Sequence, residues 1–88
     1  PTIRTLAVCP GAGGALFQSL QRVDLLLTGE MRHHDVLHRR SVGTAVVLTD
    51  HTHCERGYLP HFAQRLRERC PGLEVLVSER DTDPLAVV

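Results

Sequence analysis

An imidazole and a carboxylate stand four residues apart in the segment HTHCE at residues 51–55. If a helix begins near His51, the side chains of His51 and Glu55 lie on one side of it, with Cβ atoms about 5–6 Å apart. One nitrogen and one oxygen ligand placed in this way can bind a divalent cation such as Zn, Mn or Fe. Because two ligands alone bind weakly, this interpretation requires further ligands from other protein groups.

The same segment also has a purely structural interpretation. Asp50 or Thr52 would cap the helix that follows, and Glu55 would lie in its first turn, where the helix dipole favours a negative charge. Cys54 lies beside the candidate ligands, but the pattern around it does not require a thiolate. The spacing leaves both interpretations of His51 and Glu55 open.

A second cluster, EMRHHD at residues 30–35, contains Glu30 and His34 at the same spacing. In the functional interpretation, His34 faces the same cleft as an acid/base group or as a partner that orients a ligand. In the alternative, the cluster is the solvated beginning of a helix. Three further histidines are expected at the surface: His33, His38 and His61.

The small-residue run CPGAGG at residues 9–14 lies between an apolar segment and a helical one, where backbone N–H groups can bind phosphate. The run has neither the Gly-Lys-Ser/Thr of a P-loop nor the GxGxxG pattern of dinucleotide-binding proteins. We therefore expect a tight turn that lets the helix pack closely, with an anion contact as the alternative.

Apolar runs alternate with helical patterns along the chain. The predicted strands are residues 2–9, 23–28, 44–49 and 73–78, and the predicted helices are residues 15–21, 30–40 and 57–69. A polar turn is expected at residues 50–56 and a short edge strand at residues 85–88. Such alternation is typical of βαβ units, and near-continuous apolar strands indicate helices on both faces of a parallel sheet. The prediction is an α/β fold, a three-layer sandwich with a mostly parallel sheet of about four strands (βαβαβαβ).

The candidate chemistry is concentrated at one end of this predicted sheet. Ligands of open parallel sheets bind beyond the carboxyl ends of the strands. The segments at those ends hold most of the glycines, acids and histidines described above: residues 9–14, 28–30, 49–55 and 78–81. The segments at the opposite end resemble plain connectors, so the functional site is expected at the carboxyl end of the sheet.

Composition sets outer limits on the function. A chain of 88 residues makes one domain, and ten basic against ten acidic residues give a net charge of zero, which argues against a dedicated nucleic-acid-binding protein. No apolar run approaches the roughly 20 residues of a membrane helix. Three cysteines without a CxxC pair argue against a disulfide framework and favour a reducing compartment.

Three segments closely resemble the carboxyl-terminal portion of the Nif-three-like family: VDLLLTGEMRHHDVL, LTDHTHCERGYLPHF and EVLVSERDTDPLAVV. The family consists of dinuclear-metal proteins that are often called GTP cyclohydrolase I type 2 homologues. Its most specific motif, His-x-x-x-Glu-Arg-Gly, here begins at His51. The CPGAGG run matches the family's small-residue loop, with Ala12 where Ser is usual. The resemblance implies that residues 1–88 are a single α/β domain, the carboxyl-terminal part and roughly half of a longer protein.

The resemblance also implies roles for individual residues. His51 and Glu55 correspond to metal ligands of the family, and His34 corresponds to a histidine near the metals, which makes it the candidate catalytic residue. A complete site would hold two divalent ions (Zn, Fe or Mn), and the remaining ligands would come from the amino-terminal part of longer members. No substrate-binding residue is indicated.

Two functions follow from these expectations. The first is a metal-dependent hydrolase of a small nucleotide-like or phosphorylated substrate, which would use bound cations to activate water. The alternative is a non-enzymatic regulatory protein that binds transcriptional co-regulators. The resemblance further implies a homo-oligomer, a hexamer in relatives, located in the cytoplasm, with the nucleus and the mitochondrion as alternatives. Direct contact with nucleic acid or a membrane is not expected.

Overall fold

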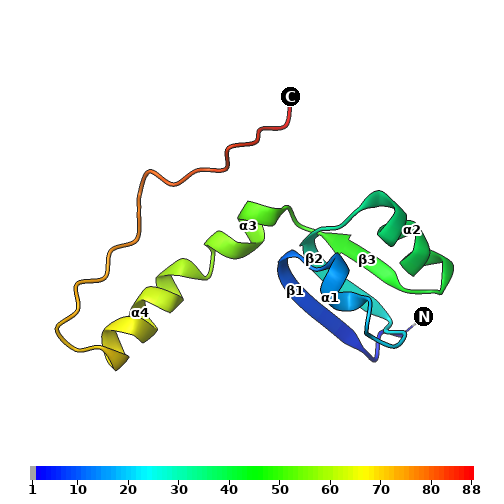
Figure 1. Cartoon of the computed structure of the whole chain (residues 1–88), viewed down its shortest axis with the longest axis horizontal. Helices are drawn as coiled ribbons and strands as arrows, with labels where there is room; N and C mark the ends of the chain where they lie inside the picture. Colours follow the sequence, from blue (N-terminus) through cyan, green and yellow to red (C-terminus); the bar gives the residue numbers. More distant parts are fainter. Residues whose placement is uncertain (1) are drawn as a thin grey trace. The chain divides into compact units, whose positions relative to one another are not determined.

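The computed structural model describes residues 2–88, which divide into two compact units (Figure 1). The first unit extends to Glu55 and contains the β-sheet, and the second covers Arg56–Val88. The two units are described separately below. The single domain over residues 1–88 stays a prediction.

Three parallel strands form the sheet of the first unit, in the order β1-β2-β3. They are β1 (Leu6–Ala12), β2 (Leu25–Glu30) and β3 (Ala45–Leu48), connected by α1 (Gly14–Phe17) and α2 (His33–Ser41). Each strand overlaps one of the apolar runs predicted as strands, with bounds that differ by at most four residues. The predicted α/β class and the parallel sheet are therefore confirmed, with three strands among the described residues instead of about four.

The core of this unit lies between the sheet and its two helices. Leu26, in the central strand, is fully buried and pairs with Ala7 on one side and Val46 on the other. Phe17 of α1 is also buried, and its backbone carbonyl accepts a hydrogen bond from the guanidinium of Arg39, which is itself buried in α2. This hydrogen bond from a buried guanidinium thus connects the two short helices.

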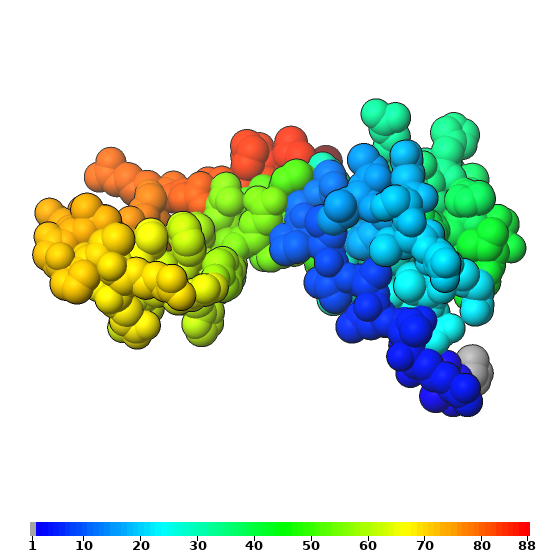
Figure 2. Space-filling model, turned by 60° about the horizontal axis from the view of Figure 1, so that its bottom comes forward, coloured from blue at the N-terminus to red at the C-terminus, as the bar shows by residue number. Residues whose placement is uncertain are grey.

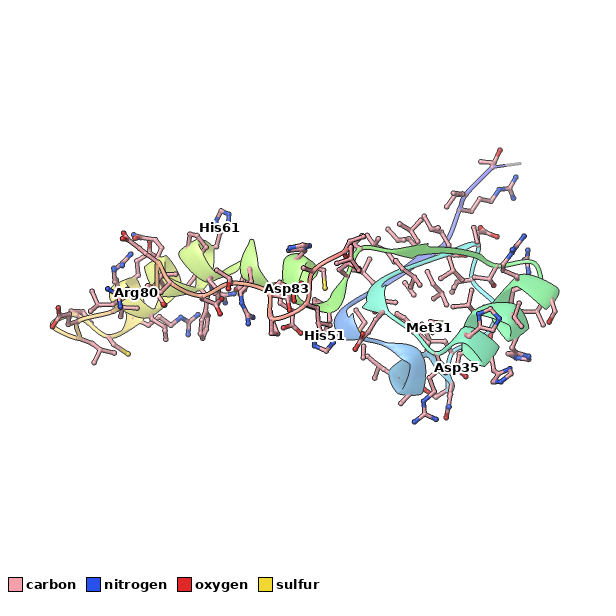
Figure 3. All side chains as sticks on the ribbon, turned by 90° about the horizontal axis from the view of Figure 1, so that it is seen from above. Met31, Asp35, His51, His61, Arg80 and Asp83 are labelled. Carbon is pink, nitrogen blue, oxygen red and sulfur yellow. The ribbon has the colours of Figure 1, made fainter. Side chains whose placement is uncertain are left out.

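Both helices lie on the same side of the three strands (Figure 3). Right-handed crossovers between strands in the order β1-β2-β3 require this arrangement. The opposite face therefore exposes apolar side chains such as Leu6, Val8 and Val47, and Figure 2 shows the segment around β1 at the surface in blue. The first unit thus has two layers, and the predicted third layer is not completed within it.

Residues 51–56 are helical, which corrects the polar turn predicted at residues 50–56. Asp50 has a positive φ of 70°, a left-handed conformation that Asp tolerates better than most residues. This residue turns the chain sharply after β3, so that α3 (His51–Arg56) begins at once. The next helix, α4 (Leu59–Arg69), begins two residues later than predicted and has a proline in its first turn.

Residues 73–78 form no strand, in contrast to the prediction. The carbonyl of Val75 accepts a hydrogen bond of 2.8 Å from the Arg67 guanidinium, so this segment is held by a side chain of α4 and not by a neighbouring strand. An apolar, β-branched segment becomes a strand only where another strand supplies backbone partners. Residues 85–88, the predicted edge strand, are also irregular. None of the helices in residues 2–88 is long and apolar enough to cross a membrane.

Candidate functional site

The candidate site lies at the carboxyl end of the sheet, as the sequence predicts for ligand-binding residues in this class of fold. Strand β2 ends at Glu30, and β3 leads through Asp50 directly into α3. Backbone hydrogen bonds continue past the end of β3, since the N–H of Thr49 donates to the carbonyl of Thr28 over 3.1 Å. This bond holds the first residue of α3, His51, beside the end of β2.

The imidazole of His51 lies between two carboxylates. Its Nδ1 is 2.8 Å from Oε1 of Glu30, and its Nε2 is 3.1 Å from Oε1 of Glu55. The three side chains are 37–60% exposed, so solvent and small solutes can reach them. The structure thus places His51 and Glu55 together on one side of α3, at the spacing noted in the sequence. Their role as cation ligands stays a prediction.

These carboxylates raise the pKa of His51 above its ordinary value. The largest contribution is the hydrogen bond to Glu30, followed by desolvation, which acts in the opposite direction, and by the attraction of the Glu55 charge. The physical cause is that negative groups on two sides stabilise the imidazolium form. Binding a cation at this ring therefore requires the loss of its proton first.

The backbone of Gly11 lies close to the side chains of His51 and Glu55. Its φ of +74° lies in the left-handed region, and a Cβ there would lie only 2.5 Å from Oε1 of Glu55 and 3.1 Å from Nε2 of His51. Glycine is required at this position for both reasons. The small-residue run at residues 9–14 therefore has a role beyond a tight turn, because it lets α3 approach the end of β1.

Cys54 joins α3 to β1, a role that the sequence did not indicate. The backbone N–H of Gly11 donates to its Sγ over 3.1 Å, and its thiol donates to the carbonyl of His51 over 3.0 Å. A Cβ on Gly29 would lie 2.7 Å from the same sulfur, so a second glycine makes room for it. Cys54 is therefore part of the packing that fixes α3. Gly11 and Cys54 are 43 residues apart, and no local pattern could have paired them.

His34 and Glu30 do not form the pair that their spacing suggests. Glu30 is the last residue of β2 and α2 begins only at His33, so the two side chains do not share a helical turn. The ring of His34 is exposed and lies edge-to-face against His33, with centroids 6.0 Å apart. Its catalytic role stays a prediction. The other histidines expected at the surface, His33, His38 and His61, are indeed exposed, and Figure 3 shows His61 projecting from α4.

An open groove of about 600 Å³ lies next to Glu30, within the size range of small-molecule sites. It runs between α1 and the beginning of α2, and its wall combines small residues with charged and polar ones. The lining residues are Ala12, Gly14, Ala15, Gln18, Glu30, Met31, Arg32 and Asp35. Met31 and Asp35, labelled in Figure 3, lie on the side of the sheet that carries both helices. Glu30 thus contacts His51 and also lines the groove.

The donor atoms fit part of a metal site. Imidazole nitrogen and carboxylate oxygen are suitable ligands for Zn, Mn or Fe, and Nε2 of His51 and Oε1 of Glu55 face each other. Within residues 2–88, however, no group of three or more His, Cys, Asp or Glu side chains is arranged to hold a metal ion. Among the described residues, His51 and Glu55 therefore offer two suitable donor atoms, fewer than a complete site requires.

The fold and the site define an α/β protein whose polar cluster lies beyond the carboxyl ends of parallel strands. The model of the family Duf34/NIF3 (NGG1p interacting factor 3) matches residues 1–84, and the chain belongs to this family. It is 41% identical over 87 residues to NIF3-like protein 1 of Rattus norvegicus. It is also 43% identical over 86 residues to NGG1-interacting factor 3 of Saccharomyces cerevisiae. The resemblance noted from the sequence is thus confirmed.

The alignments cover nearly all of this chain but only part of each relative. They include 98% and 97% of this chain, and 23% and 30% of the rat and yeast proteins respectively. A solved structure, a Bacillus cereus protein related to NIF3, superimposes with a TM-score of 0.61 at 22% identity, over 98% of this chain and 25% of that one. This similarity shows the shared fold.

Proposed function

We propose that His51 and Glu55 are two ligands of a divalent-cation site in a metal-dependent hydrolase. The observation that carries this proposal is the 3.1 Å approach of Nε2 of His51 to Oε1 of Glu55 at the carboxyl end of the sheet. The remaining ligands would come from chain beyond these 88 residues, since the relatives are much longer than this chain. In this proposal, the complete site holds two ions, each of them Zn, Mn or Fe.

The groove beside Glu30 supports the proposal that the substrate is a small molecule. A divalent cation supplies a more acidic bound water and a positive charge next to the bond that is cleaved. The chain itself would bind the cation through His51 and Glu55 and bind the substrate in the groove, where Arg32 offers a guanidinium to an anionic group. His34 would transfer a proton. We therefore propose a nucleotide-like or phosphorylated substrate.

The test compares the intact protein with its His51→Ala and Glu55→Gln variants. Each variant is expected to lose more than about 100-fold in zinc affinity, because a side chain that binds the ion directly contributes more than the 10–100-fold of a group that only orients a ligand. Hydrolysis of a panel of nucleotides and phosphate esters is expected to be lost in parallel. His61→Ala, which removes an exposed histidine of α4, is the matched control. Unchanged zinc affinity in both variants would refute the cation site.

The second candidate function is that of a non-enzymatic regulatory protein. It is favoured by the yeast relative, 43% identical, whose name describes an NGG1-interacting factor. In this proposal the protein, as a homo-oligomer, binds a transcriptional co-regulator of that kind. Purified yeast NGG1 would then bind the intact protein and its Glu55→Gln variant equally well. Equal binding without hydrolysis of any substrate would favour the regulatory function, whereas hydrolysis that depends on Glu55 would favour the enzyme.

A further inference from the structure

The two ring nitrogens of His51 face two different carboxylates. Nδ1 lies 2.8 Å from Oε1 of Glu30, and Nε2 lies 3.1 Å from Oε1 of Glu55. A neutral imidazole carries a single proton, so it can donate a hydrogen bond to only one of these carboxylates. The nitrogen without the proton has a lone pair available for a cation. The position of this proton therefore decides which nitrogen of His51 can act as a ligand.

We propose that Glu30 is a positioning residue that accepts a hydrogen bond from Nδ1–H of His51 and leaves the Nε2 lone pair directed toward Glu55. In a histidine ligand, the hydrogen bond made by one ring nitrogen fixes the tautomer and the orientation of the other. This inference rests on the proposed cation site, because it assigns the atom of His51 that would bind the ion. Glu30 would act through His51 and not contact the ion through the same oxygen.

The sheet gives Glu30 a fixed position from which to act. Glu30 is the last residue of β2, whose neighbouring strand β3 leads into α3. The turn between β3 and α3 is attached to β2 twice, since the backbone N–H of Thr49 and its hydroxyl both donate to the carbonyl of Thr28, over 3.1 and 3.4 Å. A carboxylate at the end of a strand positions a ligand more precisely than one on a loop. Glu55, by contrast, belongs to the same helix as His51.

The distances favour this proton position over the reverse one. The contact from Nδ1 to Glu30 is the shorter of the two, at 2.8 Å, and has the length of a charge-assisted N–H···O hydrogen bond. The contact from Nε2 to Glu55 is longer, at 3.1 Å, and lies above Gly11. A cation placed between Nε2 and Glu55 would bind the lone pair of Nε2 without disturbing the bond to Glu30.

Two substitutions of Glu30 distinguish the effect of its hydrogen bond from the effect of its side-chain size. Glu30→Gln keeps an acceptor oxygen, whereas Glu30→Met keeps the length of the side chain and removes every acceptor. Because Glu30 is 60% exposed, both variants of the intact protein are expected to fold. Glu30→Ala is used in place of Glu30→Met if Glu30→Met does not fold. Glu68→Gln, an exposed acid on α4, is the control for loss of a surface charge.

The first measurement is the tautomer of His51 in metal-free protein, at a pH above the raised pKa of His51, where its imidazole is neutral. The ¹⁵N shifts of the histidine rings report it, and a His51→Ala sample assigns the signals. The wild type, Glu30→Gln and Glu68→Gln are expected to show Nδ1–H, and Glu30→Met a shift toward Nε2–H. If Glu30→Met retains Nδ1–H as fully as the wild type, the inference is overturned.

The second measurement is the zinc affinity of the same proteins. Glu30→Met is expected to bind zinc about 10–100-fold more weakly, as when other groups that hydrogen-bond to a metal ligand are removed, and Glu30→Gln less than about tenfold more weakly. If His51→Ala weakens zinc binding and Glu30→Met does not, this inference fails while the cation site stands. If neither His51→Ala nor Glu55→Gln changes zinc affinity, the proposed function fails, and the tautomer measurement still tests the position of the proton.

Discussion

Nε2 of His51 lies 3.1 Å from Oε1 of Glu55, and the two atoms lie over the backbone of Gly11 at the end of β1. Two side chains of one helix thus meet a strand that is about 40 residues away in the sequence. The pair keeps its geometry only while the position beneath it has no side chain. This dependence makes Gly11 the most direct structural test of the site.

Gly11→Ala is expected to destabilise the protein and to disrupt the pair of ligands. The left-handed φ alone costs a residue other than glycine about 1–3 kcal/mol. The contact of 2.5 Å between the new Cβ and Oε1 of Glu55 adds to this cost. Thermal unfolding measures the first effect and zinc titration the second. We expect zinc affinity to fall together with stability.

Gly72→Ala is the matched control for this substitution. Gly72 also has a positive φ, 89°, but a Cβ there would meet nothing within 4 Å. The control should therefore share the backbone cost and leave zinc affinity unchanged. Equal loss of zinc affinity in the two variants would show that the contact with Glu55 is unimportant.

Leu26→Ala is expected to be the most damaging apolar truncation in the sheet. Leu26 is completely buried in the central strand, and removal of such a side chain costs about 2–5 kcal/mol in unfolding free energy. Leu16→Ala, on α1, removes a side chain that is 64% exposed and should change stability by less than about 0.5 kcal/mol. Chemical denaturation measures both values, and equal losses would contradict the described core.

Cation affinity is expected to weaken as the pH falls. The loss should begin at a higher pH than it would for a histidine with an ordinary pKa. Protons compete with the cation for Nε2, and the carboxylates of Glu30 and Glu55 raise the pKa of His51 above its usual value of about 6.5. Zinc titrations between about pH 5.5 and 8.5 should show affinity falling as the pH drops through this raised pKa. Affinity that stays constant down to about pH 6 would be inconsistent with His51 as a ligand.

Asp24 is expected to contribute stability that is lost in acid. Its carboxylate accepts hydrogen bonds from the backbone N–H groups of Arg4, at 2.8 Å, and Thr5, at 3.0 Å, and these bonds lower its pKa. A depressed pKa in the folded state stabilises the protein above the unfolded value of about 3.9, and the benefit disappears as the pH falls through the folded value.

Asp24→Asn removes this titration while keeping an acceptor oxygen. The variant should therefore show a shallower loss of thermal stability below about pH 4 than the wild type does. The measurement is a series of unfolding curves at decreasing pH for both proteins. Parallel curves would mean that the backbone bonds to Asp24 do not couple folding to its ionisation.

The α/β fold of the first unit could be predicted because its strands are local apolar runs. The order of the elements and their parallel arrangement follow from the alternation with helical patterns. The ends of the elements were less predictable: α3 begins at His51 because Asp50 adopts a left-handed conformation, for which the sequence has no clear signal. Residues 73–78 have the composition of a strand, but composition does not supply a pairing partner.

The candidate site was predictable to the extent that it is local. His51 and Glu55 are one helical turn apart, so their spacing alone indicated that they meet. Glu30 lies 21 residues before His51, and their contact arises only because β2 and β3 are neighbours in the sheet. The sequence consequently paired Glu30 with His34, the histidine at the right spacing. Contacts between strands depend on sheet order, which a single sequence does not reveal.

The most direct test of the central claim is anomalous diffraction from crystals of the intact protein grown with zinc. A shared cation predicts an anomalous peak about 2.0–2.2 Å from both Nε2 of His51 and a carboxylate oxygen of Glu55. Nδ1 of the same ring should remain hydrogen-bonded to Glu30. A fully loaded crystal whose zinc peaks all lie away from these two side chains would contradict the claim.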